Sequence, residues 1–187
     1  EYIETRLLNS GQRTNPWFQE CSDKVIADGD VICHDTDMVG PHGYCVDVSR
    51  TFFCGERAAP EGLRELYRLA TEQVAYNAAL IVPGLPFEDF MRRAWPVPNR
   101  FYAYHYATTV HGIGMHYEWP RVVYPEDWAA APAHGCFAEN MTVCIESYVG
   151  EEGGAWGVKF TEQALVTDRG VEILSRFPQE AALADAQ

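Results

Sequence analysis

The sequence lacks the cysteine patterns of disulfide-rich and zinc-binding proteins. None of its six cysteines forms a Cys-x-x-Cys pair, and most of them lie in apolar runs such as residues 31–33 and 143–145. Such a pattern is typical of buried, reduced thiols rather than of a disulfide framework, a zinc cluster or a nucleophilic cysteine. We therefore expect a cytoplasmic protein.

Long apolar runs and basic residues are also scarce. No apolar run approaches the roughly 20 residues that a membrane span requires, so we expect no membrane partner. Lysine and arginine together number 14 against 27 aspartates and glutamates, which gives a formal net charge of −13. A phosphate backbone is bound by a basic face, so this charge argues against a nucleic-acid partner. Acidic residues are available, however, for binding cations.

The apolar periodicity predicts an α+β domain that spans residues 1–187. Residues 31–39 and 44–53 read as the strands of a hairpin, separated by a Gly-Pro-His-Gly turn. Helices are predicted over residues 60–81 and 87–95, followed by an irregular stretch with short strands over residues 96–138. A second hairpin is predicted from residues 141–149, a glycine-rich loop and residues 158–167.

Acidic residues recur on the predicted strands. Side chains alternate across a strand, so Asp35 and Asp37 share one face. A hairpin centred on His42 places Asp47 opposite Asp37, and a hairpin centred near Gly154 places Glu162 opposite Glu146. Facing carboxylates destabilise a sheet unless a cation lies between them. Oxygen and imidazole ligands favour Mn, Fe, Co or Zn, and so many acids favour two divalent ions that share bridging carboxylates.

Five blocks in this order resemble the ligand motifs of the methionine aminopeptidase, prolidase and creatinase superfamily, which has the pita-bread fold. The blocks are Asp35-Thr36-Asp37, residues 43–51 with Asp47, His111-Gly112-Ile113-Gly114, Glu146-Ser147 and Lys159-Phe160-Thr161-Glu162. The resemblance implies a curved antiparallel sheet with flanking helices. It also implies that Asp37 is the first ligand, that Asp47 and Glu162 bridge two metal ions, and that His111 and Glu146 complete the second site.

Asp35 is an additional acid beside the first ligand, and it resembles a metal-binding Asp of the dimethylsulfoniopropionate lyases of this fold (the DddP type). Tyr106 resembles a substrate-site tyrosine of the same lyases. Two departures from these patterns stand out. The residue six positions after His111 is Tyr117, where the lyases carry an Asp proposed as the catalytic base. The peptidases place a histidine shortly after the ligand histidine, and here His116 and Glu118 fall in that region at a different spacing.

The superfamily carries further strands, helices and an N-terminal domain ahead of the first ligand block, whereas only 34 residues precede Asp35. The chain also opens without a methionine. We therefore expect it to be the C-terminal catalytic part of a longer protein, lacking its N-terminal portion, or to need a partner for completion. A homodimer is also expected.

The sequence is compatible with three functions. The first is a lyase that removes a proton beside a carboxylate and expels dimethyl sulfide to give acrylate, with a base from His116, Tyr117 or Glu118. The second is hydrolysis of an Xaa-Pro peptide bond, in which Glu146 shuttles the proton and His116 supports the oxyanion. The third is a pita-bread binding module without turnover. The partner is therefore a small-molecule or dipeptide substrate in the first two cases.

Overall fold

The computed structural model describes residues 2–3, 7–17 and 19–184. Two antiparallel sheets dominate it. The first contains β1 to β4, in which β3 pairs with the other three strands, and the second has the strand order β6-β5-β7-β8-β9. The strands are β1 Tyr2–Ile3, β2 Leu8–Ser10, β3 Val31–Val39, β4 Cys45–Phe53, β5 Val110–Gly112, β6 Arg121–Val122, β7 Thr142–Gly150, β8 Gly157–Thr167 and β9 Gly170–Ile173.

The helices fall between the two hairpins in the chain, as predicted. Helix α1 spans Glu61–Leu80 and begins directly after Pro60, and α2 spans Phe87–Arg93, two residues shorter than expected. The short α3, Asn99–Tyr102, lies in the stretch for which composition gave little information, as do β5 and β6. Two 3₁₀ turns, η1 at Gly11–Thr14 and η2 at Pro41–Gly43, complete the elements. Among the described residues, no helix is both long enough and apolar enough to cross a membrane.

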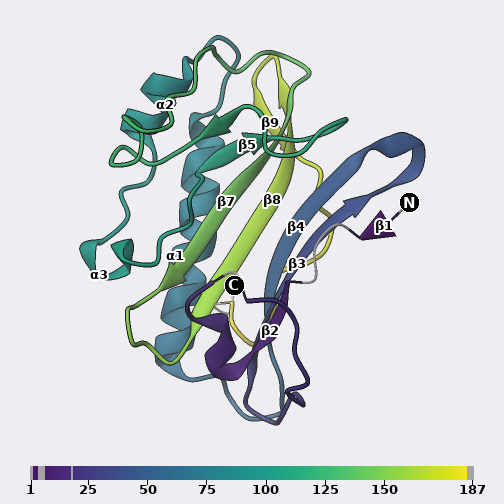
Figure 1. Ribbon diagram of the computed structural model, residues 1–187, viewed down its shortest axis with the longest axis vertical. Coiled ribbons are helices and arrows are strands. Elements are labelled where there is room, and N and C mark those ends of the chain that lie inside the picture. The colour runs from purple at the N-terminus through teal and green to yellow at the C-terminus, as the bar shows by residue number, and fades with distance from the viewer. Residues whose placement is uncertain (1, 4–6, 18, 185–187) are drawn as a thin grey trace.

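Helix α1 packs along one face of β7 and β8, and the β3–β4 hairpin extends away from this helix on the other side of β8 (Figure 1). The core between helix and sheet includes Leu63, Val74, Ile145 and Phe160, all essentially buried. We call this helix-covered side the outer face. The opposite side, which carries Asp47 and Glu146, is the inner face.

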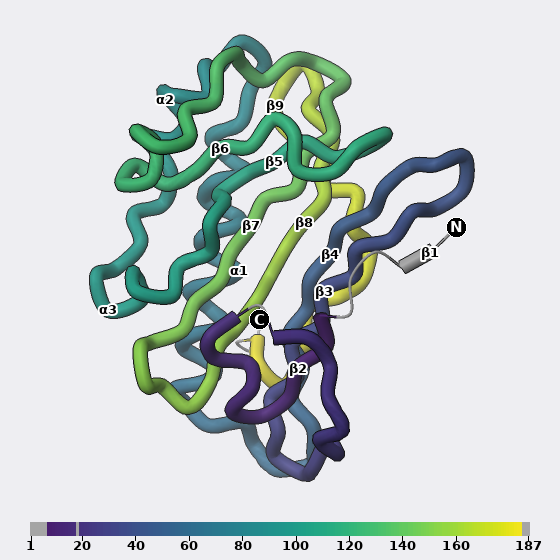
Figure 2. The backbone as a smooth tube through the Cα atoms, in the orientation of Figure 1, coloured from purple at the N-terminus to yellow at the C-terminus, as the bar shows by residue number. Residues whose placement is uncertain are grey.

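The two sheets meet where β4 runs beside β8 (Figure 2). Thr51 Oγ1 donates to the carbonyl of Lys159 at 2.9 Å, and Ser49 Oγ lies 2.9 Å from Thr161 Oγ1. Partner numbers fall along β4 as they rise along β8, so the two strands run antiparallel. The inner faces of both hairpins therefore form one continuous surface.

The register of the second hairpin is fixed by a close approach at its loop end. Gly150 pairs with Gly157, and a Cβ atom on Gly157 would lie 2.1 Å from the hydroxyl oxygen of Tyr148. That hydroxyl donates to the carbonyl of Thr14 at 2.9 Å. Only glycine leaves room for the tyrosine to cross the strand pair, so this contact holds the hairpin in one alignment.

Candidate metal centre

The first hairpin brings three aspartates together on the inner face. Asp37 lies directly opposite Asp47 and Asp35 opposite Ser49, which confirms the predicted register. One carboxylate oxygen from each of the three aspartates lies within 4.8 Å of the others. Asp35 and Asp47 are each only 5% exposed, so their charges are held in a region of low dielectric constant.

The second sheet supplies a histidine and a glutamate to the same place. His111 in β5 pairs with Cys144 in β7, so its ring projects from the face that also carries Glu146. His111 Nε2 lies 3.1 Å from Asp47 Oδ2 and 3.3 Å from Glu146 Oε1, and both His111 and Glu146 are fully buried. The hairpins and β5 thus converge on one cluster.

The donor atoms of this cluster suit a divalent cation. His111 Nδ1 lies 3.1 Å from the carbonyl of Gly112, which accepts from it, so Nε2 faces the two carboxylates and would offer its lone pair to a cation that displaces the Nε2 proton. Among the described residues, no hydrogen bond reaches Asp47 Oδ1, His111 Nε2 or Glu146 Oε1, although all three atoms are buried. Buried acceptors that face one another need a cation between them. One imidazole and two carboxylates therefore fit one metal ion.

The pKa values of the two buried carboxyl groups shift in opposite directions. Burial raises the pKa of Asp47 well above its ordinary range, and the Glu146 carboxylate adds to the rise. Burial has the same tendency at Glu146, but Lys159 and His111 outweigh it and hold that pKa at about 2. Burial opposes protonation of His111, yet Asp47 and Glu146 raise its pKa well above the ordinary value. The two carboxyl groups therefore differ because Lys159 lies beside Glu146 and not beside Asp47.

Lys159 provides the cation on the other side. Its Nζ atom is fully buried and donates to Glu146 Oε2, to Thr161 Oγ1 at 2.6 Å and to Ser49 Oγ at 3.0 Å. Thr161 Oγ1 donates in turn to Glu146 Oε2 at 2.8 Å, and Ser49 Oγ donates to Asp35 Oδ1 at 2.5 Å. All three ammonium protons are therefore used within a network that joins β4, β7 and β8.

Glu162 does not belong to the cluster, and the prediction that it faces Glu146 is wrong. The residue opposite Glu146 is Thr161, whereas Glu162 lies opposite Ile145 on the outer face. There its carboxylate accepts from Arg50 Nη2 at 2.8 Å. A shift of one residue moves every side chain of a strand to the other face, so Glu162 and Asp47 cannot share a bridged ion. The six-ligand, two-ion set expected from the resemblance is therefore one carboxylate short.

The alternation of apolar residues along β8 indicates the correct face for Glu162. Val158 and Phe160 are apolar and pack beneath α1, so the residue two positions further, Glu162, must also lie on the outer face. By the same rule Lys159 and Thr161 lie on the inner face. Neither residue was assigned a role from the sequence, although both belong to the block that carried the resemblance.

The remaining predicted site residues lie at different distances from the cluster. Glu118 is half exposed and its Oε1 lies 3.9 Å from His111 Nε2. The side chain of His116 is exposed, and its Nδ1 donates to the carbonyl of Tyr117 at 2.5 Å. Tyr117 packs against the small cluster of Cys45, Ile113 and Cys144.

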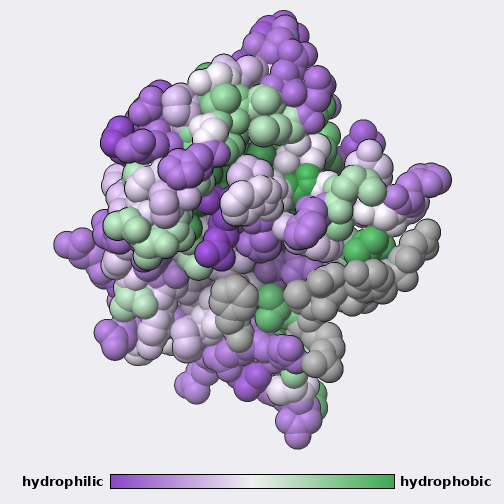
Figure 3. Space-filling view, turned by 45° about the horizontal axis from the view of Figure 1, so that its top comes forward, coloured by the Kyte–Doolittle hydropathy of each residue, from purple (hydrophilic) through white to green (hydrophobic). Residues whose placement is uncertain are grey.

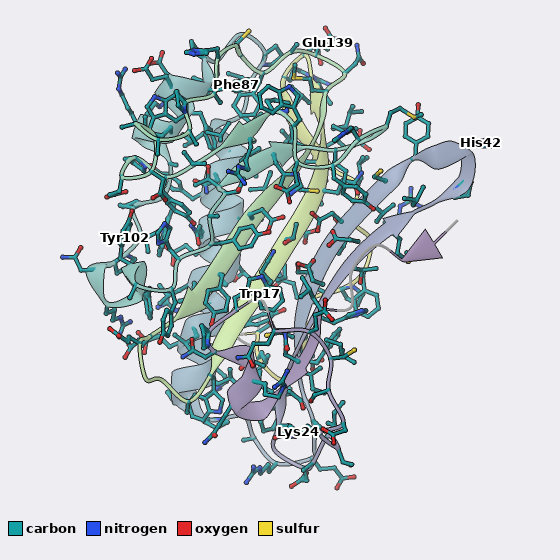
Figure 4. The ribbon with its side chains drawn as sticks, viewed as in Figure 1. Trp17, Lys24, His42, Phe87, Tyr102 and Glu139 are labelled. Atoms are coloured by element: carbon teal, nitrogen blue, oxygen red, sulfur yellow. The ribbon has the colours of Figure 1, made fainter. Side chains whose placement is uncertain are left out.

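Tyr106 lies directly beside the network, with its ring centroid 4.6 Å from Lys159 Nζ. Burial and the nearby carboxylates, Glu146 first, raise its pKa well above the ordinary value, so the phenol stays protonated. Trp17, which had no predicted role, covers the same region, 5.7 Å from Lys159 Nζ and over the middle of the sheet in Figure 4. Hydrophilic residues also gather near the centre of the face shown in Figure 3.

Comparison with known proteins fits this geometry. The profile of metallopeptidase family M24 matches residues 3–168. The chain belongs to this family. It is 37% identical over 183 residues to the dimethylsulfoniopropionate lyase DddP of Roseovarius nubinhibens and 35% identical to that of Roseobacter denitrificans. Each alignment covers 98% of this chain but only 41% of the relative, so the chain spans about two-fifths of the length of these lyases.

Solved structures of the M24 family confirm the pita-bread fold. The X-Pro aminopeptidase of Thermotoga maritima superposes with a TM-score of 0.77 at 22% identity, covering 96% of this chain and 49% of that one. The Xaa-Pro dipeptidase of Bacillus anthracis gives 0.76 at 25% identity, covering 93% of this chain and 47% of that one. This M24 chain therefore has the expected architecture, and its cluster of Asp47, His111 and Glu146 lies on the inner face of that fold.

Proposed function

We propose that this M24 chain is the catalytic part of a metal-dependent lyase that acts on a small carboxylate substrate of the dimethylsulfoniopropionate type. Similarity to two such lyases along nearly the whole chain supports the proposal. The observation that carries it is the position of Tyr106, whose protonated phenol borders both the metal cluster and Lys159. This residue resembles a substrate-site tyrosine of those lyases.

The proposed reaction is a β-elimination. A base takes the proton from the carbon beside the substrate carboxylate, and the released electron pair forms the carbon–carbon double bond. The carbon–sulfur bond breaks, and dimethyl sulfide leaves with that bond's electrons while acrylate remains. When bound at Asp47, His111 and Glu146, a divalent ion such as Mn, Fe, Co or Zn would supply a Lewis acid for the substrate carboxylate.

The residues of the chain divide this work. Tyr106 is placed to donate a hydrogen bond to the substrate carboxylate, because its hydroxyl stays protonated beside the cluster. Among the three candidate bases, Glu118 has the most favourable position, since its carboxylate approaches His111 while remaining open to solvent. Tyr117, at the position where the lyases carry their Asp, and His116 remain the alternatives to be tested.

A second candidate is hydrolysis of an Xaa-Pro peptide bond, and the 25% identity to an Xaa-Pro dipeptidase favours it. Hydrolysis by two ions would need carboxylates that bridge both of them. Asp47 is present for this role, but Thr161 lies where Glu162 was expected. Elimination needs only one Lewis acid for the substrate carboxylate, and Asp47, His111 and Glu146 suffice to hold one ion. These residues therefore favour the lyase over the peptidase.

The test is to supply the metal-loaded protein with dimethylsulfoniopropionate and, separately, with a Gly-Pro dipeptide. We expect dimethyl sulfide in the headspace and acrylate in solution, without release of proline. The variant Glu118→Gln should reduce elimination by about 100-fold or more, as removal of a general base does, while Tyr117→Phe and His116→Ala change it little. Proline release without dimethyl sulfide would replace the lyase by the peptidase, and turnover of neither substrate would contradict both.

A further inference from the structure

The two carboxylate oxygens of Glu146 have different surroundings on the inner face. One of its carboxylate oxygens, Oε1, faces His111 Nε2 at 3.3 Å without a hydrogen bond. The other oxygen, Oε2, accepts from both Lys159 Nζ and Thr161 Oγ1. An oxygen with two protein donors is already satisfied, so only Oε1 is available to a metal ion.

The strand position that would have to supply a second bridging ligand is occupied by Thr161. It lies directly opposite Glu146, and its hydroxyl is within 2.9 Å of Ser49 Oγ. A neutral hydroxyl that donates to a carboxylate is a poor substitute for a charged bridging ligand. Glu162, one residue further, is held on the outer face by Arg50.

Positive charge is already present beside Oε2 of Glu146. Lys159 Nζ makes three hydrogen bonds there and lies 3.9 Å from Asp35 Oδ2. A divalent ion near Asp35, Asp37 and Asp47 would therefore have to bind beside a buried ammonium group. Like charges at such separations repel strongly in a buried site.

We propose that this centre binds a single divalent ion, at Asp47, His111 and Glu146, and that Lys159 and Thr161 take the place of a second ion. The proposal rests on the metal-dependent function above but concerns the number of ions, which is measured without turnover. The ammonium of Lys159 then holds Glu146 and Asp35 in position, as a second ion would do in a two-ion centre.

The first test counts ions in the unmodified protein. After loading with excess Mn²⁺ and gel filtration, elemental analysis should find one ion per chain. Electron paramagnetic resonance should show the spectrum of isolated Mn²⁺, and a second equivalent should add only the signal of the free aqueous ion. Two retained ions, or the spectrum of a spin-coupled pair, would overturn the proposal, as would retention of none.

The second test restores the missing carboxylate. Thr161→Glu should raise the retained Mn²⁺ from one to two ions per chain, whereas Thr161→Val should leave it at one. The matched control on the outer face, Glu162→Gln, should also retain one ion. A folded Thr161→Glu variant that retains only one ion would show that Thr161 does not limit the stoichiometry. If that variant fails to fold, the ion count and the resonance spectrum of the unmodified protein decide alone, and neither depends on which substrate is turned over.

Discussion

The hairpins β3–β4 and β7–β8 are built alike but use their acidic residues differently. In the first, Asp37 and Asp47 face each other on the inner face, at the candidate metal centre. In the second, Glu146 lies on the inner face and Glu162 on the outer face, where it pairs with Arg50. A difference of one residue in register thus decides whether a carboxylate lies at the candidate metal centre or pairs with Arg50 on the outer face.

The largest expected effect comes from removing the acid that both parts of the site share. Asp47→Ala should abolish metal retention and activity together. Asp47 contacts His111 and lies both in the group of three aspartates and in the group that contains His111 and Glu146. Elemental analysis and the elimination assay on the same preparation measure this. Cys45→Ala, two residues earlier on the same strand, is the control and should leave both largely intact. Full metal content in the Asp47 variant would remove Asp47 from the centre.

A smaller effect is expected from breaking the two ion pairs made by β8, in which Lys159 pairs with Glu146 and Glu162 pairs with Arg50. Lys159→Met removes the buried partner of Glu146 and should lower the free energy of unfolding of the metal-free protein by about 3–5 kcal/mol. Glu162→Gln should lower it by only ~1 kcal/mol, because Arg50 keeps the carbonyls of Ser49, Thr161 and Phe177 as acceptors. Urea unfolding in the presence of a chelator measures both. Equal losses would mean that the inner and outer pairs are energetically equivalent.

The sequence predicted most of the fold because its strands and helices carry clear periodicity. The predicted strand over residues 31–39 matches β3, and the predicted helix over residues 60–81 exceeds α1 by one residue at each end. The turn at His42, seen at the hairpin tip in Figure 4, fixed the first register correctly. The glycine-rich loop after Gly150 predicts a hairpin centre near Gly154, but Gly150 pairs with Gly157, so each partner on β8 is shifted by one residue. Its register depends on Tyr148 crossing the glycine pair and bonding to Thr14, a contact between segments far apart in the chain.

The candidate site was predicted in part for the same reason. Asp35, Asp37, Asp47, His111 and Glu146 lie on the inner face as expected, since each belongs to a strand with evident alternation. The role of Lys159 was not accessible from the motif alone. A buried lysine becomes recognisable only when its partners, Glu146 from β7 and Ser49 from β4, are known in space.

The most direct measurement is anomalous X-ray diffraction from crystals of the protein loaded with Mn²⁺ or Zn²⁺. We expect one anomalous peak per chain, bordered by His111 Nε2 and by carboxylate oxygens of Asp47 and Glu146, with Lys159 Nζ on the far side of Glu146. Two peaks bridged by Asp47, or a peak coordinated by Glu162, would contradict it.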